Sequence, residues 1–291
     1  MTEAASAQVS GAGGAMVQVP RRCIVTVALA LRRVTRPIKG YGAHPWRRGY
    51  PWIDEPKRLG IAAAVVVAVF VFGMVLLDAA ATNSVRYLAH GVVWFFDWIT
   101  DFGKAAWVLW PLGVLFLILA ALPRSLPRMA RAVVMALMVR VGFLFVAVSL
   151  PGLFASFIKN VIGRARPGVG GSVNPYLFDP FHWTPAWAGL PSGHTTAAFA
   201  IMAAFATLFP RARTYLLIYA LLIAVSRVVV KAHYPTDAAA GALVGIVGVL
   251  LVRRWFALQR LGFSILPDGT LAQYPGPSLR RINSVARTLL A

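Results

Sequence analysis

The sequence predicts an all-α fold, namely a polytopic membrane helical bundle with six transmembrane helices and both termini in the cytoplasm. Composition is the first reason, because 59% of the 291 residues are hydrophobic and only 13% are charged. The second reason is that several apolar runs approach the roughly 20 residues with which a helix crosses the hydrocarbon core. The single cysteine, Cys23, excludes a disulfide framework and any multi-cysteine metal site.

The apolar runs divide the chain into three parts. Residues 59–258 form the six-span domain, which follows a basic and partly disordered cytoplasmic segment, 1–58, and precedes a cytoplasmic tail, 259–291. The segment Tyr87–Trp98 is rich in aromatic residues but short, so we expect an interfacial helix rather than a span. The predicted spans are, in chain order, Leu59–Ala81, Ala106–Leu122, Val133–Phe157, Ser192–Phe209, Thr214–Ala232 and Thr236–Ala257.

The basic residues orient these spans. The net charge is +20. Most lysines and arginines lie beside the predicted spans, in the segments that are cytoplasmic if the N-terminus is inside. The positive-inside rule therefore favours two cytoplasmic termini. The same distribution favours contact with an anionic membrane surface. It argues against nucleic acid as a partner, because the basic residues form no domain of globular size.

Lys159 and Arg166 form the first of three polar motifs that stand at the ends of apolar segments. Their spacing of seven residues predicts one helix face, on which they lie two turns apart, and Pro167 is expected to end that helix. Arginine offers a planar fork and lysine a point charge, a pair that suits a phosphoryl dianion. Interfacial anchoring explains this pair equally well when it is considered alone.

The second motif is Pro191-Ser192-Gly193-His194, directly before an alanine-rich span. Proline suits the first turn of a helix, glycine lets a backbone approach a ligand, and the free N–H groups at a helix start bind anions. His194 would lie at the mouth of this anion site, where it is placed to donate a proton. An ordinary capped helix start with a surface histidine is the alternative.

The third motif comprises Arg227, His233 and Asp237. A carboxylate one turn from a histidine can accept its N–H, fix the tautomer and leave the other ring nitrogen as a nucleophile. Arg227 lies roughly two turns back on the fifth span, where it can hold a phosphoryl oxygen. An interfacial turn without chemistry is the alternative.

The predicted topology brings all three motifs to the outer face of the membrane. Asp179 and Asp237 are the only acids between residues 150 and 260, which are too few for an oxygen cage around magnesium or for a two-metal site. We therefore predict neither a metal nor another cofactor. Lysine, arginine and helix-start N–H groups would stabilise the transferred phosphoryl group, and a histidine would carry it covalently.

Taken together, Lys159-x6-Arg166-Pro167, Pro191-Ser192-Gly193-His194 and Ser226-Arg227-x5-His233-x3-Asp237 resemble the three signatures of the type 2 phosphatidic acid phosphatase superfamily. The resemblance in order and spacing covers residues 159–237. It implies that His233 attacks phosphorus, that Asp237 supports it and that His194 protonates the leaving lipid oxygen. It also implies a set of residues that bind the phosphoryl oxygens, namely Lys159, Arg166, Ser192, Gly193 and Arg227.

Arg164 lies off the predicted Lys159/Arg166 face, so it receives no role. The loop Gly168–Leu190 carries several aromatic residues between glycines and prolines, and we expect it to shape specificity. Its aromatic side chains could meet acyl chains or sugar faces, and they could equally be interface anchors.

The predicted function is that of a metal-independent lipid phosphatase, which hydrolyses a lipid phosphomonoester or diphosphate at the periplasmic face of a bacterial inner membrane. The superfamily that the chain resembles implies phosphatidylglycerol phosphate, phosphatidic acid, undecaprenyl diphosphate or lipid A as the substrate, and the sequence does not choose among them. A lipid phosphotransferase with the same site is one alternative. A non-catalytic lipid-binding or transport protein is another, although none of the three motifs is broken.

Overall fold

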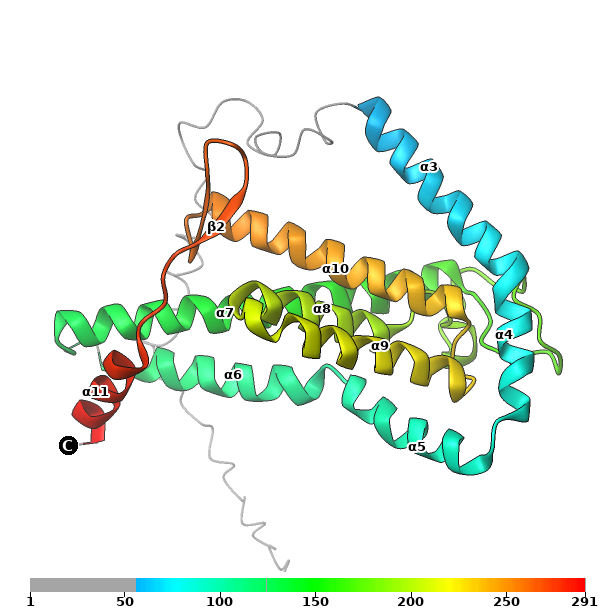
Figure 1. The fold of residues 1–291 in the computed structure, drawn as a ribbon, viewed down its shortest axis with the longest axis horizontal. Coiled ribbons are helices and arrows are strands. Elements are labelled where there is room, and N and C mark those ends of the chain that lie inside the picture. The colour runs from blue at the N-terminus through cyan, green and yellow to red at the C-terminus, as the bar shows by residue number, and fades with distance from the viewer. Residues whose placement is uncertain (1–55, 124, 291) are drawn as a thin grey trace, which may run out of the picture. The chain divides into compact units, whose positions relative to one another are not determined.

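The structure is a computed structural model that describes residues 56–123 and 125–290, which form helices and one short hairpin (Figure 1). Features predicted for residues 1–55, including Cys23 and most of the basic N-terminal segment, lie outside the described residues. Within the described part of the chain the all-α prediction is confirmed.

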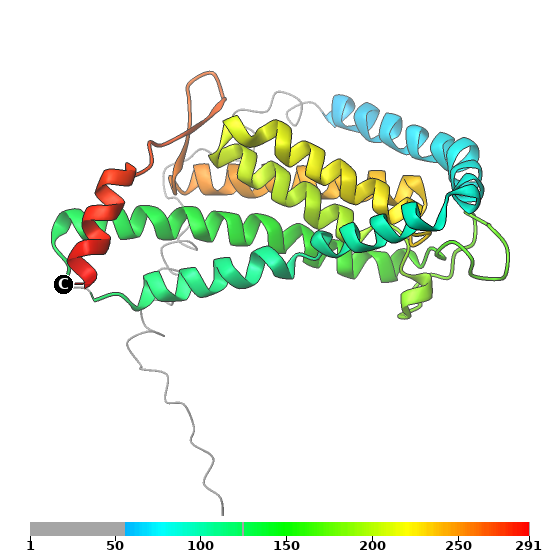
Figure 2. The same cartoon turned by 60° about the horizontal axis from the view of Figure 1, so that its bottom comes forward.

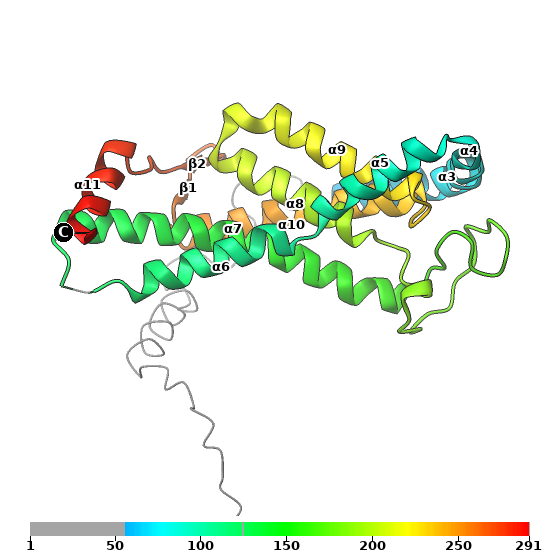
Figure 3. The same cartoon turned by 90° about the horizontal axis from the view of Figure 1, so that it is seen from below.

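Four helices form the centre of the bundle, namely α7 (Arg128–Ile162), α8 (Gly193–Leu208), α9 (Arg213–Val229) and α10 (Pro235–Leu258). Helix α8 packs against the other three (Figures 1 and 3). Its small side chains let the neighbouring helices approach closely, as is common inside membrane bundles. The fully buried alanines of α8 are Ala198, Ala200 and Ala204.

Two glycines of α10 let this helix lie directly against α8. A Cβ on Gly241 would lie 2.5 Å from the carbonyl oxygen of Ser192, and a Cβ on Gly245 would lie 2.6 Å from that of Thr196. Only glycine permits such a close approach of two backbones. The first turns of α10 are thereby held against the start of α8, where the second motif lies.

The first helical run is not a regular α-helix along its whole length. Helix α3 (Pro56–Gly73) passes into a π-helical turn, η1 (Met74–Asp78), then into α4 (Ala79–Ser84) and the 3₁₀ turn η2 (Val85–Tyr87). Most side chains of this run are apolar and exposed, whereas Asp78 is fully buried. Single π-turns inside helices are rare and are frequent at functional sites.

The second helical run consists of α5 (His90–Thr100), the 3₁₀ turn η3 (Asp101–Gly103) and α6 (Ala106–Ala121). Helix α5 packs along α9, and α6 packs along α7 (Figure 2). Most of the aromatic segment expected in the membrane interface therefore belongs to α5, beside the bundle.

Short elements complete the fold. Turn η4 (Pro185–Trp187) lies in the long loop after α7, and η5 (Pro210–Ala212) joins α8 to α9. After α10, strands β1 (Phe263–Ile265) and β2 (Leu271–Gln273) pair antiparallel along their whole length. Helix α11 (Leu279–Leu290) follows them.

The apolar helices confirm a helical membrane bundle. Helix α8 is also apolar, but with 16 residues it is shorter than the five runs named below. The number of spans and the cytoplasmic position of the termini stay predictions. Five runs in the described part of the chain are long and apolar enough to cross a membrane, namely Lys57–Tyr87, His90–Ala121, Arg128–Ile162, Pro210–Val229 and Pro235–Leu258.

The helix ends that carry the three motifs all lie at one end of the bundle. They are the C-terminal ends of α7 and α9 and the N-terminal ends of α8 and α10 (Figures 1 and 3). Turn η1 and helix α4 lie at the same end, whereas the hairpin and α11 lie at the opposite end (Figure 1). The fold therefore gathers the predicted site residues at the ends of four separate helices and in the segments directly next to these ends.

Candidate active site

The helix of the first motif ends earlier than its spacing predicted. Helix α7 stops at Ile162 because Gly163 adopts a left-handed conformation (φ 62°), and a Cβ there would collide with the carbonyl group of Asp179. Lys159 therefore lies on the last turn of α7, whereas Arg166 lies in the loop that follows. The predicted common helix face was wrong, although the two charges still lie within electrostatic range of each other.

The loop after Gly163 is fixed by backbone hydrogen bonds. The N–H of Arg166 donates to the carbonyl group of Ala186 at 2.9 Å. The N–H of Gly189 donates to the carbonyl group of Arg164, also at 2.9 Å. These bonds hold both ends of the loop together, beside the segment that leads into the second motif.

His233 lies in the turn between α9 and α10, and its side chain is 3% exposed. Its Nδ1 atom lies 2.8 Å from the carbonyl oxygen of Gly189. A carbonyl oxygen only accepts hydrogen bonds, so Nδ1 must carry the proton when the ring is neutral, and Nε2 then holds the free lone pair. His233 therefore has the tautomer that a nucleophilic Nε2 requires.

The surroundings of His233 also favour its neutral form. Burial lowers the pKa of His233 below its ordinary value of 6.5. The Asp237 carboxylate opposes this shift, and the positive charges of Arg166 and Arg227 add to it. The imidazole is consequently uncharged at neutral pH, and a neutral ring keeps the lone pair that a nucleophile uses.

Asp237 is fully buried beside His233, but it does not accept the Nδ1 proton of His233. That proton is donated to the carbonyl group of Gly189. The Oδ2 atom of Asp237 lies 3.7 Å from His233 Nδ1, beyond hydrogen-bond reach, and accepts from the backbone N–H of Tyr234 at 2.9 Å. This differs from the direct hydrogen bond that the sequence predicted. The reason is the loop before α8, which brings a backbone carbonyl closer to the ring than the carboxylate is.

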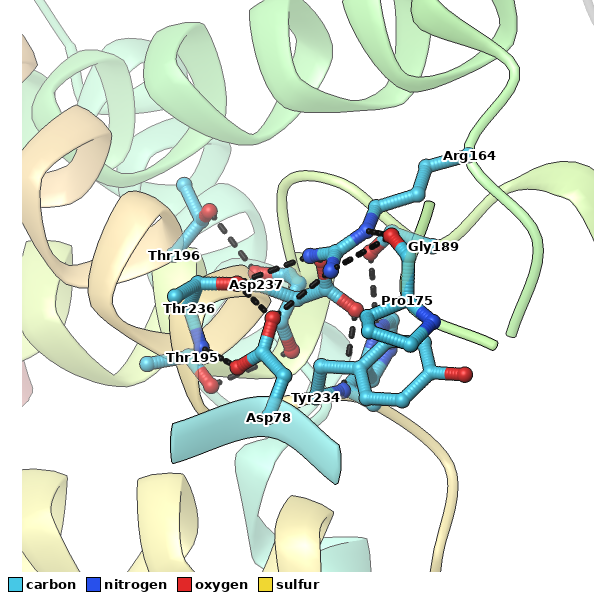
Figure 4. Close-up of polar contacts among 11 residues, drawn as sticks. Asp78, Arg164, Pro175, Gly189, Thr195, Thr196, Tyr234, Thr236 and Asp237 are labelled. Carbon is cyan, nitrogen blue, oxygen red and sulfur yellow. Dashed lines mark hydrogen bonds and ion pairs between the residues drawn. The ribbon is translucent and has the colours of Figure 1, made fainter. Parts of the chain in front are cut away.

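Figure 4 shows the buried cluster that includes Asp237. The fully buried Arg164 donates from Nη1 to Asp237 Oδ1 (2.5 Å) and to Thr236 Oγ1 (2.8 Å). From Nη2 it donates to Asp78 Oδ2 (2.6 Å), and both Nη2 and Nε donate to the Pro175 carbonyl group. The guanidinium group thus places all five of its N–H groups on protein acceptors.

The sequence analysis missed both Arg164 and Asp78. Helical periodicity hid Arg164, because the helix that was expected to carry it ends before it. Asp78 stands alone in an apolar run, and an acid in such surroundings is a functional candidate on energetic grounds. That signal was available in the sequence, but it names no partner.

The three cations of the motifs are less saturated than Arg164. Within the part of the chain that the structure describes, the buried Nε atoms of Arg166 and Arg227 have no hydrogen-bond partner. Arg227 donates from Nη1 to Thr100 Oγ1 at 2.7 Å, and Lys159 and Arg166 are only half-buried. Because a buried donor without an acceptor costs free energy, these groups are typical of an anion-binding site.

The second motif lies at the start of α8, as predicted, but Ser192 is the N-cap and Gly193 the first helical residue, so Pro191 precedes the helix and is not part of its first turn. The N–H of Ser192 donates to the carbonyl group of Asp237 at 3.0 Å, which ties this start to α10. Apart from its chain neighbours and the backbone of its own helix, no described atom lies within 4 Å of the position that a Cβ on Gly193 would take, so the helix end is open there. His194 lies within electrostatic range of both His233 and Arg227.

Turn η3 borders the site, which the sequence did not indicate. A Cβ on Gly103 would lie 3.2 Å from Cδ2 of His194, so this turn packs on the histidine. The hydroxyl group of Tyr219 donates to the carbonyl group of Phe102 at 2.9 Å and holds the turn on α9. Together with Thr100, which accepts from Arg227, these contacts make the α5–η3 segment part of the wall of the site.

The chain resembles known proteins over most of its length. Residues 140–261 match the PAP2 superfamily. A lipid A 1-phosphatase of Rhizobium johnstonii is 35% identical over 234 residues, which are 77% of this chain and 91% of that protein. A lipid A 1-phosphatase of Rhizobium etli is 35% identical over 216 residues, which are 74% and 92% of the two chains.

Among solved structures, LpxE of Aquifex aeolicus aligns with 60% of this chain and 93% of its own, at 23% identity and a TM-score of 0.42. The sequence matches decide the family, because two relatives at 35% identity align over nearly their whole length. The chain belongs to the PAP2 superfamily, in its membrane lipid phosphatase branch.

Proposed function

We propose that the protein hydrolyses a lipid phosphomonoester or diphosphate and that Nε2 of His233 carries the phosphoryl group between the two half-reactions. The observation that supports this most directly is the hydrogen bond from His233 Nδ1 to the carbonyl group of Gly189. It leaves the lone pair on Nε2, on a ring whose charge is influenced by Arg166 and Arg227. A neutral nucleophile among cations suits attack on an anionic phosphorus centre.

In the first half-reaction, Nε2 of His233 attacks phosphorus, so that an N–P bond forms while the P–O bond to the lipid breaks. His194 gives its proton to the departing lipid oxygen. Lys159, Arg166, Arg227 and the N–H groups of Ser192 and Gly193 are assigned to the equatorial oxygens, whose charge must be stabilised in the transition state.

In the second half-reaction, water attacks the phosphorus atom of the phosphohistidine. His194, now neutral, takes the proton of this water, and the N–P bond breaks as inorganic phosphate leaves. Both histidines are then in their starting states, so the cycle needs no other reactant.

We assign this chemistry to protein groups alone, without a metal or another cofactor. The two carboxylates of the buried cluster, those of Asp78 and Asp237, already accept hydrogen bonds from Arg164, Thr236 and Tyr234. Charge stabilisation therefore falls to the cations and the start of α8. A chelator is expected to leave phosphate release unchanged.

The 1-phosphate of lipid A is the first substrate to test, because both named relatives are lipid A 1-phosphatases. Phosphatidylglycerol phosphate, phosphatidic acid and undecaprenyl diphosphate are the further candidates. We place the reaction at the periplasmic face of a bacterial inner membrane, since the basic residues favour two cytoplasmic termini and the motifs then lie on the outer side.

The test is phosphate release by the purified, detergent-solubilised protein from these four lipids, with His233→Ala as the blank. We expect wild-type release from lipid A to exceed that from the other three, and an acid-quenched reaction to trap a phosphohistidine. Release from none of the lipids would contradict the proposal. Release that falls as an added alcohol acceptor becomes phosphorylated would instead support a phosphotransferase.

A further inference from the structure

Asp78 is an acid in a helical run whose other side chains mostly point outward and are apolar. Its neighbours Val75, Leu76 and Leu77 are all more than half exposed, whereas Asp78 is fully buried. Burying a carboxylate is costly unless cations and hydrogen-bond donors surround it. The π-helical turn ends at Asp78 and leads into α4, which lies at the end of the bundle where the motifs gather (Figure 1).

The carboxylate of Asp78 is bound on both of its oxygens. Oδ2 accepts from Arg164 Nη2 at 2.6 Å and from the Thr236 hydroxyl group at 2.5 Å. Oδ1 accepts from the backbone N–H of Thr236 at 3.0 Å. This N–H belongs to the first turn of α10, which has no partner within its own helix, so Asp78 caps α10 from another helix.

The turn that Asp78 caps carries the groups of two motifs. Asp237 holds the N–H of Tyr234 through its side chain and the N–H of Ser192 through its carbonyl group. Tyr234 directly follows His233, and Ser192 directly precedes the open start of α8. A shift of this turn would therefore move both the nucleophile and the helix start.

Arg164 links the same turn to the first motif. Its side chain binds Asp78 and Asp237, and its carbonyl group accepts from the N–H of Gly189, whose own carbonyl group orients His233. Figure 4 shows the two carboxylates on one side of this guanidinium group. All three motifs thus meet at one ionic cluster, to which Asp78 contributes from outside the region that matches the superfamily, 140–261.

The cluster also has a charge that suits the reaction. Two carboxylates and one guanidinium group give the cluster one net negative charge, and the Asp237 carboxylate of this cluster lies 3.7 Å from Nδ1 of His233. A phosphohistidine carries positive charge on its ring, and nearby negative charge stabilises it. Replacing Asp78 by asparagine would keep the shape of the side chain but make the cluster neutral.

We propose that Asp78 is a positioning residue of the active site, which acts through Arg164 and the first turn of α10 to place and charge-stabilise the His233 ring. The inference rests on the proposed phosphatase function. It assigns a role to a fourth segment, which the three motifs do not include.

The test compares Asp78→Asn with wild type in the lipid phosphate release assay. The matched control is Asp268→Asn. Asp268 is exposed in the turn between β1 and β2, in the hairpin at the opposite end of the bundle. We expect kcat of Asp78→Asn to fall roughly 10- to 100-fold with KM within about twofold, because misplacing a reactive group slows chemistry more than binding. The trapped phosphohistidine should form more slowly, and Asp268→Asn should match wild type.

A second variant, Thr236→Val, covers the case in which Asp78→Asn does not fold. It removes only the hydroxyl group between Asp78 and Arg164, without changing charge, and kcat should fall roughly 10-fold. Elution volume and thermal unfolding give the folded fraction to which each rate is normalised. A folded Asp78→Asn with wild-type kcat, a change in KM alone, or a misfolded Asp78→Asn beside a Thr236→Val with wild-type kcat would overturn the inference. An inactive wild type would instead refute the proposed function.

Discussion

Arg164 and Arg166 stand two residues apart in the sequence and lie in two different kinds of environment. Arg164 is fully buried, and all five of its N–H groups are bonded to protein acceptors. Arg166 is half-buried, and its Nε has no partner among the described residues. The difference lies in the carboxylates, because the fold brings two of them to Arg164. A saturated arginine holds structure, whereas an unsaturated one can bind a ligand.

His233 stands at the boundary between these two regions, which we call the closed cluster (Asp78, Arg164, Thr236 and Asp237) and the open cations (Lys159, Arg166 and Arg227). Its Nδ1 is bonded to Gly189, whose N–H in turn donates to Arg164. Its Nε2 is the atom that we assign to the substrate. The ring is therefore tied through Gly189 to the closed cluster and lies within electrostatic range of Arg166 and Arg227 among the open cations.

The largest expected effect is that of His233→Ala, which removes the group shared by both regions. Phosphate release should fall at least about 10⁴-fold, because no other group replaces the nucleophile. Gel filtration should show that the variant still folds. His90→Ala, an exposed histidine at the start of α5, is the control and should keep wild-type activity. Substantial turnover by the His233 variant would contradict the assignment of His233 as the nucleophile.

Arg164→Gln tests the closed cluster. It leaves two fully buried carboxylates without their cation, which should lower the free energy of unfolding by roughly 3–5 kcal/mol. Thermal and denaturant unfolding in detergent measure this loss. Arg166→Gln is the matched control, and its stability should stay within about 1 kcal/mol of wild type. Equal stability of the two variants would remove the distinction between the arginines.

Arg166→Gln in turn tests the open cations. Its kcat/KM should fall roughly 10²- to 10³-fold, because one donor to the charge that develops in the transition state is lost. Steady-state kinetics on the best lipid measure the effect. Arg166→Lys keeps the charge but loses the planar fork, so it should recover only part of the activity. Full activity of Arg166→Gln would place phosphate binding elsewhere.

Gly241→Ala tests how closely the closed cluster depends on the contact between α10 and α8. The added Cβ would lie 2.5 Å from the carbonyl oxygen of Ser192, so we expect a loss of roughly 1–3 kcal/mol in stability. Gly152→Ala in α7 is the control, since nothing lies within 4 Å of its Cβ position. That variant should be neutral or more stable by up to about 1 kcal/mol. Similar thermal unfolding of both variants would show that α10 and α8 can move apart to accommodate the added Cβ without loss of stability.

The pH dependence should show the smallest effect. Because burial lowers the pKa of His233 below 6.5, the ring stays neutral as the pH falls to about 6.5, and protonation of this ring should not lower kcat/KM in that range. Activity should decline only below that, as the ring binds a proton and loses its lone pair. Arg166→Gln removes a positive charge and should move this acid limb to higher pH. A limb above 6.5 in wild type would contradict the burial of the ring.

Stability should follow the same sign. The unfolded His233 binds a proton near pH 6.5, whereas the folded one binds it only at lower pH. Folding therefore releases a proton from His233 at pH values between its folded and unfolded pKa. The contribution of His233 to the free energy of unfolding is present above pH 6.5 and declines as the pH falls below 6.5.

Much of the site could be predicted from the sequence, because each motif is a local feature. Apolar run lengths gave the helices, and their agreement is good for α8 and α10, which begin and end within one residue of the predicted spans. The family resemblance carried by the three motifs is confirmed by the matches to the PAP2 superfamily and its lipid phosphatases. The individual roles of the motif residues stay predictions.

The contacts that the sequence did not reveal are distant along the chain. Asp78 lies 86 residues from Arg164 and 158 from Thr236, and His233 lies 44 residues from the carbonyl group that orients it. The end of α7 at Gly163 likewise depends on the distant Asp179. Helical period and motif spacing describe neighbours within a few turns, so they cannot report such pairs.

Sequence alone determined the membrane bundle and the residue types of the three motifs, since hydrophobic run length and charge are properties of the chain itself. Only the tertiary structure decided that Arg164 has protein acceptors for all its N–H groups and that Arg166 does not. The reason is that this depends on which carboxylates the packed helices bring within hydrogen-bond distance.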